Sequence, residues 1–490
     1  MAQDATAVLA FDLGATSGRA ILGSLDRGRL EFRELHRFPN DPVRYNGDLH
    51  WDIPRLWHEV QAGLHLAAQH PRPPASIGLD TWGVDYALLG EGGVLLENPY
   101  HYRDQRTRGM LDEACRILGA DRIYDATGIQ FMGFNTLFQI FAASRRTPKL
   151  LATAEALLTM PDLLNFWLTG VKACEYTNAT TTQFLDRRNG QWARELLAGL
   201  GIPTHFLQPI IQPGTVLGSL RPELTAGGAL KGARVVAPAC HDTGSAVAAV
   251  RTGGSTAFLS SGTWSLLGTE VAAAVVNPQS RLLNFTNEGG VGGTFRLLKN
   301  ITGMWLLEGC KKAWDASGRK YSYGELLDLA SAADPLRSLI DPDDPLFAAP
   351  DDMPAAIGAS CRRTGQPVPA SPGAYTRAIV ESLALKYRLA LEQLATLCGK
   401  PFTALHIFGG GCRNALLNQF TADATGCRVL AGPAEATAIG NIAMQLVGIG
   451  AIGSIDDART LIEQSFPPDA FEPSGRGDWD RAFASFKTLA

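Results

Sequence analysis

Ala239-Cys240-His241-Asp242-Thr243-Gly244-Ser245 is the stretch around which the rest of the chain is organised. An apolar run over 234–238 precedes it and a second apolar run over 246–250 follows it, which predicts a strand, a short loop and a helix start. Asp242 therefore lies at a strand-to-helix break, where a functional site can form. A purely structural role as a helix cap stays open, because Asp is favoured at helix N-termini.

Composition narrows the class of protein around this loop. A chain of 490 residues predicts two to three domains, and 46% hydrophobic with 19% charged residues is typical of soluble globular proteins. A net charge of -4 predicts no nucleic-acid partner, and no apolar run is long enough to span a membrane. The N-terminus lacks the basic start of a signal peptide, and the eight cysteines are dispersed without a C-x-x-C motif. We expect a cytoplasmic protein that acts on small molecules.

Two similar hairpins are predicted about half the chain apart. Residues 8–23 and 256–268 each read as an apolar strand, a turn of small polar residues around Gly14 or Gly262, and a second apolar strand. Such turns can cradle phosphate oxygens, although an ordinary hairpin with a polar turn gives the same pattern. Their spacing predicts a duplicated architecture with domains over 5–250 and 251–453, followed by a peripheral segment over 454–490.

Other segments have a character that suits a sugar or a nucleotide. Residues 80–86 bring two acids and two aromatic rings together, and 100–107 and 130–136 are similarly polar and aromatic. Arg103 and Arg106 could instead form surface ion pairs. The triple glycine of 409–411 follows a strand and precedes a helix, which allows close approach of the backbone to a nucleotide.

Three further segments give structural expectations. Residues 175–183 are expected to be a polar, β-rich segment, and the Asp/Pro-rich residues 333–372 an extended surface loop. A long amphipathic helix is predicted over 374–398, ended by Gly399.

Five segments in fixed order resemble the FGGY carbohydrate kinases: the Asp12 hairpin, residues 103–107, the Asp242 loop, the Gly262 hairpin and the turn at 409–411. The resemblance covers about residues 7 to 450. It implies an α/β protein with an actin-like, ribonuclease-H-like ATPase fold, in which two similar domains surround a central cleft. The runs 78–85 and 175–183 are most similar to members that act on L-rhamnulose. This implies phosphorylation of that sugar at O1 by ATP with a divalent metal such as Mg²⁺, in the catabolism of L-rhamnose.

The resemblance also assigns roles to individual residues. Asp242 would be the general base that accepts the proton of the attacking sugar hydroxyl. The sugar would be contacted by Gly83, His241, Asp242, Thr243 and Asn300. ATP would be contacted by Ala15, Thr16, Ser17, Gly18, Arg19, Thr263, Glu308 and Gly410. Asp12 would reach Mg²⁺ through water, since Mg²⁺ keeps much of its hydration shell.

One position departs from the family pattern, because Glu308 stands where glutamine is expected. A carboxylate near phosphates is unfavourable unless it faces ribose or metal. Small-molecule sugar and ATP are the expected partners, with no nucleic acid and no membrane, and the expected state is a monomer or weak homodimer. The alternatives are a kinase for another ketose such as L-fuculose or xylulose, a non-catalytic actin-fold sugar or nucleotide sensor, and an ATP-driven chaperone or filament protein.

Overall fold

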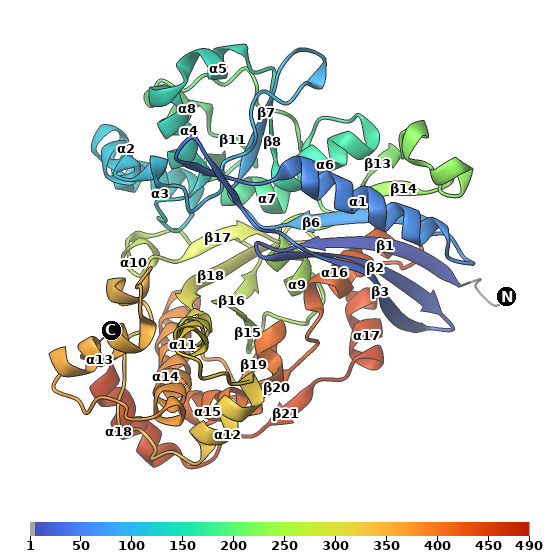
Figure 1. The fold of residues 1–490 in the computed structure, drawn as a ribbon. Helices are drawn as coiled ribbons and strands as arrows, with labels where there is room; N and C mark the ends of the chain where they lie inside the picture. Colours follow the sequence, from blue (N-terminus) through green and yellow to red (C-terminus); the bar gives the residue numbers. More distant parts are fainter. Residues whose placement is uncertain (1–4, 490) are drawn as a thin grey trace. The chain divides into compact units, whose positions relative to one another are not determined.

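The computed structural model describes residues 5–489, which form two compact units that interleave along the chain (Figure 1). The first unit contains the residues up to Arg251 together with Glu270–Leu297 and Ala436–Phe466. The second contains Thr252–Thr269, Leu298–Glu435 and the residues from Pro467 onward.

The first unit is built on a six-stranded sheet with the order β13-β14-β6-β1-β2-β3. Strand β1 pairs antiparallel with β2 and parallel with β6, and β6 pairs parallel with β14. The strands are β1 (Thr6–Leu13), β2 (Ser17–Asp26), β3 (Arg29–Pro39), β6 (Ser76–Thr81), β13 (Thr215–Ser219) and β14 (Arg234–Ala237). The hairpin predicted over 8–23 is therefore confirmed as β1 and β2.

Two helices mark the two faces of this sheet. Gly63 in α1 (Ile53–Ala68) lies against the ring of Phe11, whereas Gly78 lies against Asn441 of α16 (Ala436–Gly448). Successive side chains of a strand point to opposite faces, and Asp12 is one residue after Phe11. Asp12 therefore lies on the face that α16 covers, next to its strand partner Asp80. Helix α9 (Asp242–Ala248) also packs against α16.

The first unit has many further elements, and several of them, including α4 (Thr136–Arg146) and α6 (Met160–Thr169), contribute to a large apolar core on the α1 side of the sheet. Helix α6 begins at Met160 and ends before Gly170, which adopts the left-handed conformation that favours glycine. These further elements are β4 (Val43–Tyr45), β5 (Asp48–His50), β7 (Tyr86–Leu89), η1 (Glu91–Gly93), η2 (Gln105–Thr107), α2 (Met110–Leu118), α3 (Ala120–Thr127), α4 (Thr136–Arg146), α5 (Pro148–Thr153), β8 (Ala156–Thr159), α6 (Met160–Thr169), β9 (Cys174–Glu175), α7 (Tyr176–Thr181), β10 (Leu185–Asp186), β11 (Gln191–Trp192), α8 (Arg194–Gly199), β12 (Ile210–Ile211), η3 (Pro222–Leu224), η4 (Ala226–Gly228), α10 (Pro278–Leu282), β17 (Thr286–Gly289) and α17 (Ile455–Ser465).

The second unit repeats the strand pattern of the first. Its strands follow the order β18-β16-β15-β19-β20-β21, in which β15 pairs antiparallel with β16 and parallel with β19. The elements are β15 (Thr256–Ser261), β16 (Trp264–Val271), β18 (Phe295–Thr302), α11 (Trp305–Ala316), α12 (Tyr323–Ser331), η5 (Pro345–Phe347), α13 (Met353–Arg363), α14 (Pro372–Cys398), β19 (Ala404–Phe408), η6 (Gly410–Arg413), α15 (Ala415–Thr425), β20 (Arg428–Ala431), β21 (Asp469–Phe471) and α18 (Arg476–Phe486). In each unit a hairpin is followed by parallel strands and an antiparallel edge strand, so the duplicated α/β fold is confirmed.

Two local expectations were wrong. Most of the segment 175–183 is helical and forms α7 over Tyr176–Thr181, because the Glu175 side chain accepts the backbone N–H groups of Thr177 and Asn178 and so caps its first turn. Residues 333–372 contain helix α13, which begins after the capping residue Asp352. The long helix predicted over 374–398 is confirmed as α14.

The C-terminal residues contribute to both units. Helix α17 belongs to the first unit, and α18 buries Trp479, Phe483 and Phe486 in a core of the second. The segment expected to be peripheral therefore supplies core side chains.

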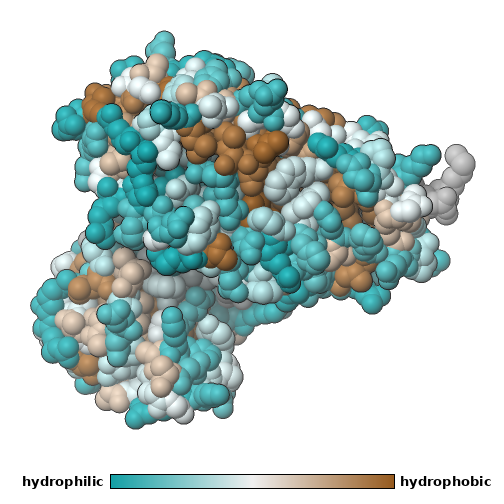
Figure 2. Space-filling model, turned by 45° about the horizontal axis from the view of Figure 1, so that its top comes forward, coloured by the Kyte–Doolittle hydropathy of each residue, from teal (hydrophilic) through white to brown (hydrophobic). Residues whose placement is uncertain are grey.

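The surface is mostly hydrophilic on the face shown in Figure 2, where apolar residues form separate groups. Within residues 5–489, none of the helices combines the length and apolar character that a membrane crossing needs.

Candidate active site

The Asp242 loop connects β14 to α9, as the sequence predicts. Asp242 is the first residue of α9, and its side chain is 30% exposed in a segment that is otherwise buried. Its Oδ1 accepts the Thr243 N–H at 2.5 Å and the Thr243 hydroxyl at 3.1 Å. The carboxylate thus receives donors on Oδ1 and faces a partly open space.

Buried acids hold this loop in place. The Glu175 carboxylate accepts the Cys240 N–H at 3.0 Å and the Thr177 hydroxyl at 2.6 Å. That hydroxyl accepts the His241 N–H at 3.1 Å, and Asp162 in turn accepts the Glu175 N–H at 3.0 Å. Burial raises the pKa of Glu175 to about 6 and that of Asp162 to about 8. The chain from α6 through α7 therefore fixes the backbone on which Asp242 stands.

Three carboxylates lie near one another: Asp12 in β1, Asp80 in β6 and Asp242 at the start of α9. Burial raises the pKa of Asp80 well above its usual value, and the negative charges of Asp12 and Asp242 add to this effect. The Asn441 amide donates to Asp80 at 2.5 Å, and Asp12 forms an ion pair with Arg19 of β2. The first unit thus places Asp12 and Asp242 in one electrostatic neighbourhood.

The turn between β1 and β2 holds the predicted phosphate-facing residues. Gly14 N–H donates to the Ser17 carbonyl at 2.9 Å, and the Asn40 amide donates to the Gly14 carbonyl at 2.8 Å. Ala15 and Ser17 are half-buried and Thr16 is exposed. Gly18 is buried because its backbone lies against the Phe38 ring, where a Cβ atom would be only 2.3 Å away. A side chain larger than that of glycine would not fit here unless the Phe38 ring moved.

The acid and aromatic residues after β6 form a cluster with Trp51. Oδ2 of Asp85 accepts the indole N–H groups of Trp51 at 2.7 Å and Trp82 at 3.0 Å, and the two rings lie 4.0 Å apart. Oδ1 of Asp85 accepts the Gln139 amide at 2.7 Å, and Arg106 donates to the other end of that amide at 2.9 Å. Arg106 thus acts in this network, not in a surface ion pair.

Gly83 lies at the rim of this cluster. A Cβ atom on Gly83 would be 3.0 Å from the Thr181 side chain, so only glycine keeps the present spacing. The next residue, Val84, has a φ of 66°, which is unfavourable for a β-branched side chain. Its N–H donates to Thr181 at 3.0 Å and its carbonyl accepts the Thr136 hydroxyl at 2.5 Å, and these bonds hold the strained backbone.

The second unit gathers another set of predicted residues around its own hairpin. The turn at Gly262 and Thr263 accepts N–H groups from the start of α11, including that of Met304 at 2.9 Å. The Thr263 hydroxyl donates to Oε1 of Glu308 at 2.9 Å. Thr263 and Glu308 are therefore adjacent, as a shared role in nucleotide binding requires.

The triple glycine packs beside the same hairpin. A Cβ atom on Gly411 would be 2.0 Å from the Ser261 hydroxyl, whereas Gly410 is exposed with nothing near its Cβ position. Gly410 thus presents bare backbone at the surface of this unit. Asn300 is half-buried in β18.

Sequence reasoning missed Trp51, Glu288, Arg296 and the supporting role of Glu175. Arg296 is completely buried at the start of β18, in the part of that strand that belongs to the first unit. It lies beside Glu288 of β17, and both side chains are next to His241. A lone charge in an apolar strand has no local signature, so no pattern in the sequence could pair these residues.

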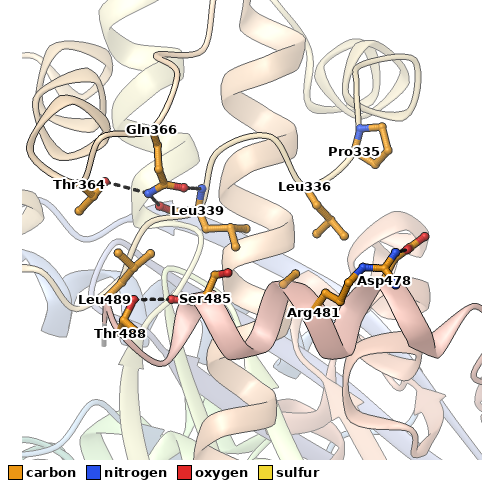
Figure 3. Close-up of a pocket in the computed structure, with 11 residues that line it drawn as sticks. Pro335, Leu336, Leu339, Thr364, Gln366, Asp478, Arg481, Ser485, Thr488 and Leu489 are labelled. Atoms are coloured by element: carbon orange, nitrogen blue, oxygen red, sulfur yellow. Dashed lines mark hydrogen bonds and ion pairs between the residues drawn. The ribbon is translucent and has the colours of Figure 1, made fainter.

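A separate cavity of about 550 Å³ lies in the second unit along α18 (Figure 3). Leu336, Leu339, Gln366 and Arg481 are among its lining residues, and none of the predicted site residues lines it. Within the described part of the chain, no cluster of three or more His, Cys, Asp or Glu side chains is arranged to hold a metal ion.

Comparison with known proteins agrees with this arrangement. The N-terminal domain of the FGGY family of carbohydrate kinases matches residues 7–249, and the C-terminal domain of that family matches residues 257–449. A rhamnulokinase from Bacteroides thetaiotaomicron is 47% identical over 98% of both chains. A rhamnulokinase from Halalkalibacterium halodurans is 41% identical over 94% of this chain and 97% of that protein. The crystal structure of gluconate kinase from Lactobacillus acidophilus has a TM-score of 0.80 at 17% identity, covering 99% of this chain and 96% of that one.

The chain belongs to the FGGY family of carbohydrate kinases and has the actin-like ATPase fold. It is a sugar kinase, which uses ATP as the phosphoryl donor.

Proposed function

We infer that the chain transfers the γ-phosphoryl group of ATP to O1 of L-rhamnulose, a step in L-rhamnose catabolism. The observation that carries the sugar assignment is the 47% identity, over 98% of both chains, to a protein named rhamnulokinase. The runs 78–85 and 175–183, which we propose to face the sugar, both lie in the first unit, where the Val84 N–H donates to the Thr181 hydroxyl.

We propose Asp242 as the general base of this reaction. Its carboxylate is partly exposed, stands at the start of α9 and receives donors from Thr243 on Oδ1. As the sugar oxygen bonds to the γ-phosphorus, its proton passes to Asp242, and the bond from phosphorus to ADP breaks. The same loop presents His241 and Thr243 for sugar binding.

The other contacts of the sugar and ATP remain proposals as well. Gly83 and Asn300 would position the sugar. The hairpin residues 15–19 and Thr263 would contact phosphates, and Gly410 would lie against the adenosine part. Glu308 would contact the nucleotide through its bond to Thr263.

Mg²⁺ is the proposed metal, and Asp12 is its proposed protein contact through water. Mg²⁺ often takes only one or two carboxylates and completes its shell with water and phosphate oxygens. Asp12 is a buried carboxylate on the face of the sheet that α16 covers, and a contact through water from this one acid fits this habit. When bound, the metal would neutralise charge on the transferring phosphates.

ATP supply places the proposed reaction in the cytoplasm, and all eight cysteines are free thiols, as a reducing compartment allows. A monomer or weak homodimer stays the expected state, which sedimentation can measure.

The test is phosphorylation of L-rhamnulose, L-fuculose and xylulose by ATP and Mg²⁺, with Asp242→Asn run beside the unchanged protein. The expected result is preference for L-rhamnulose and loss of most kcat in Asp242→Asn, with nucleotide binding retained. An exposed acid on α2, Asp112→Asn, is the control and should keep full activity. Preference for another ketose would refute the sugar assignment, and an active Asp242→Asn would refute the base.

A further inference from the structure

His241 lies between the proposed base and a buried ion pair. Its Nε2 is 3.3 Å from Oδ1 of Asp242. On the other side of the ring, Nδ1 is 3.1 Å from a terminal nitrogen of Arg296 and 3.3 Å from Oε2 of Glu288. Arg296 and Glu288 are 3.1 Å apart, and the Arg296 side chain is completely buried. The ring thus has the carboxylate of Asp242 on one nitrogen and a guanidinium on the other.

The guanidinium decides which nitrogen of the ring carries the proton. Two groups face Nδ1 of His241: Arg296, which has only donors, and the Glu288 carboxylate at 3.3 Å, which is already paired with Arg296. With Arg296 as its hydrogen-bond donor, Nδ1 is the acceptor. In the neutral ring the proton is therefore on Nε2, next to Asp242. The opposite tautomer would set two donors against each other at Nδ1 and turn a lone pair toward the Asp242 carboxylate.

Glu288 keeps Arg296 in this position. Burial acts to raise the pKa of Glu288, but the charge of Arg296 and the contact with His241 outweigh burial, and the pKa lies below its usual value. The carboxylate is thus charged and holds the guanidinium, while the Arg296 Nε–H donates to the Gly289 carbonyl at 2.8 Å. Among the described residues, Nη1 of Arg296 has no hydrogen-bond partner, which is costly for a buried charge. An apolar residue at this strand position would stabilise the folded chain more than Arg296 does.

We propose that Glu288 and Arg296 are positioning residues that fix His241 as its Nε2–H tautomer, so that the ring presents an N–H to Oδ1 of Asp242. This proposal rests on Asp242 being the base. Oδ1 then faces three donors: the Thr243 N–H, the Thr243 hydroxyl and His241 Nε2–H. Oδ2 is the oxygen left to receive the sugar proton. His241 keeps its own proton throughout, so the proton leaves the sugar oxygen and ends on Asp242.

The first test measures the tautomer in the unchanged protein. Nitrogen-15 labelling of the nine histidines, with His241→Gln to assign the signal, reports which ring nitrogen is protonated. The expected spectrum shows Nε2 protonated and Nδ1 unprotonated at neutral pH. A protonated Nδ1 with an unprotonated Nε2 would overturn the proposal. The tautomer is read in the unchanged chain, and the His241→Gln variant serves only to assign the signal.

The second test removes the donor. We expect Arg296→Met to lower kcat by about 10-fold or more while the KM for ATP stays within about 2-fold, because proton transfer is affected and nucleotide binding is not. Arg296→Lys keeps a charged donor and should recover part of the lost kcat. Arg377→Met is the matched control, because it also breaks a largely buried pair, with Glu381 at 2.7 Å, in the second unit. It should lower thermal stability and leave kcat unchanged.

The two proposals can fail separately. If Asp242→Asn is active, the base assignment fails and the positioning role falls with it. If Asp242→Asn is inactive but a folded Arg296→Met keeps full kcat, the positioning role alone is wrong.

Discussion

The Trp51 indole N–H donates a hydrogen bond to Oδ2 of Asp85 at 2.7 Å, although the two residues are far apart in the chain. Asp85 also accepts Trp82, Gln139 and the Tyr102 N–H, so one buried carboxylate holds two indole rings and two neighbouring segments. Flat rings fixed by a carboxylate suit a sugar, whose faces are apolar and whose edges carry hydroxyls.

We therefore expect Asp85→Asn to raise the KM for the sugar by roughly 10-fold, the effect of about 1.4 kcal/mol. The asparagine N–H₂ would face the Gln139 N–H₂, and Arg106 prevents that amide from turning over. Steady-state kinetics with the sugar varied gives the KM. The KM for ATP should not change, and an unaltered sugar KM would show that this cluster does not serve the sugar.

Glu175 should make stability depend on pH. Burial raises its pKa from 4.5 to about 6, so the folded chain binds the proton more tightly than the unfolded chain. The stability that this group contributes is present at low pH and is lost as pH rises from about 4.5 to about 6, a loss of about 2 kcal/mol.

Glu175→Gln removes this dependence. When the pH is lowered from 7.5 to 5, the unchanged protein should gain about 1 kcal/mol of unfolding free energy relative to the variant. Denaturant titrations at the two pH values measure it. Comparing the two proteins at each pH cancels the titrating groups that do not interact with Glu175 and leaves Glu175 and its neighbour Asp162. A constant difference would contradict the raised pKa of Glu175.

Glu308→Gln should improve ATP binding. The amide oxygen can still accept the Thr263 hydroxyl, now at 2.9 Å from Oε1, while the negative charge near the proposed phosphate site is removed. We expect the KM for ATP to fall several-fold with little change in kcat. Glu308→Ala, which also loses the hydrogen bond, separates the two effects. A higher KM in Glu308→Gln would mean that the carboxylate faces ribose or metal.

Gly440→Ala tests the support of α9 by α16. A Cβ atom at this position would be 1.8 Å from the Ser245 carbonyl oxygen, so the helix that begins with Asp242 would have to move. We expect a loss of about 1–3 kcal/mol or more in unfolding free energy, together with reduced kcat. Gly477→Ala in α18 has nothing near its Cβ and should be neutral or slightly stabilising. Equal melting temperatures for the two variants would contradict the close contact.

Much of the fold followed from local pattern. Three elements were predictable: the hairpin of β1 and β2, helix α6 with its end at Gly170, and the long helix α14. Strand alternation, helix caps and helical periodicity depend on residues that are neighbours in the sequence. The segment 175–183 was not predictable, since its helix depends on the buried cap Glu175, whose carboxylate also accepts the Cys240 N–H of the distant Asp242 loop.

The sequence by itself determined the two hairpins, the Asp242 loop and the triple glycine, because each is a continuous run whose residue types have a direct physical meaning. These runs together also determined the family. Only the tertiary structure decided that Arg296 and Glu288 lie beside His241, that Trp51 shares Asp85 with Trp82, and that Asp80 lies beside Asp12. These pairs join strands and loops that are distant in the chain. Burial then sets their charges and hydrogen bonds, and burial is a property of the folded chain alone.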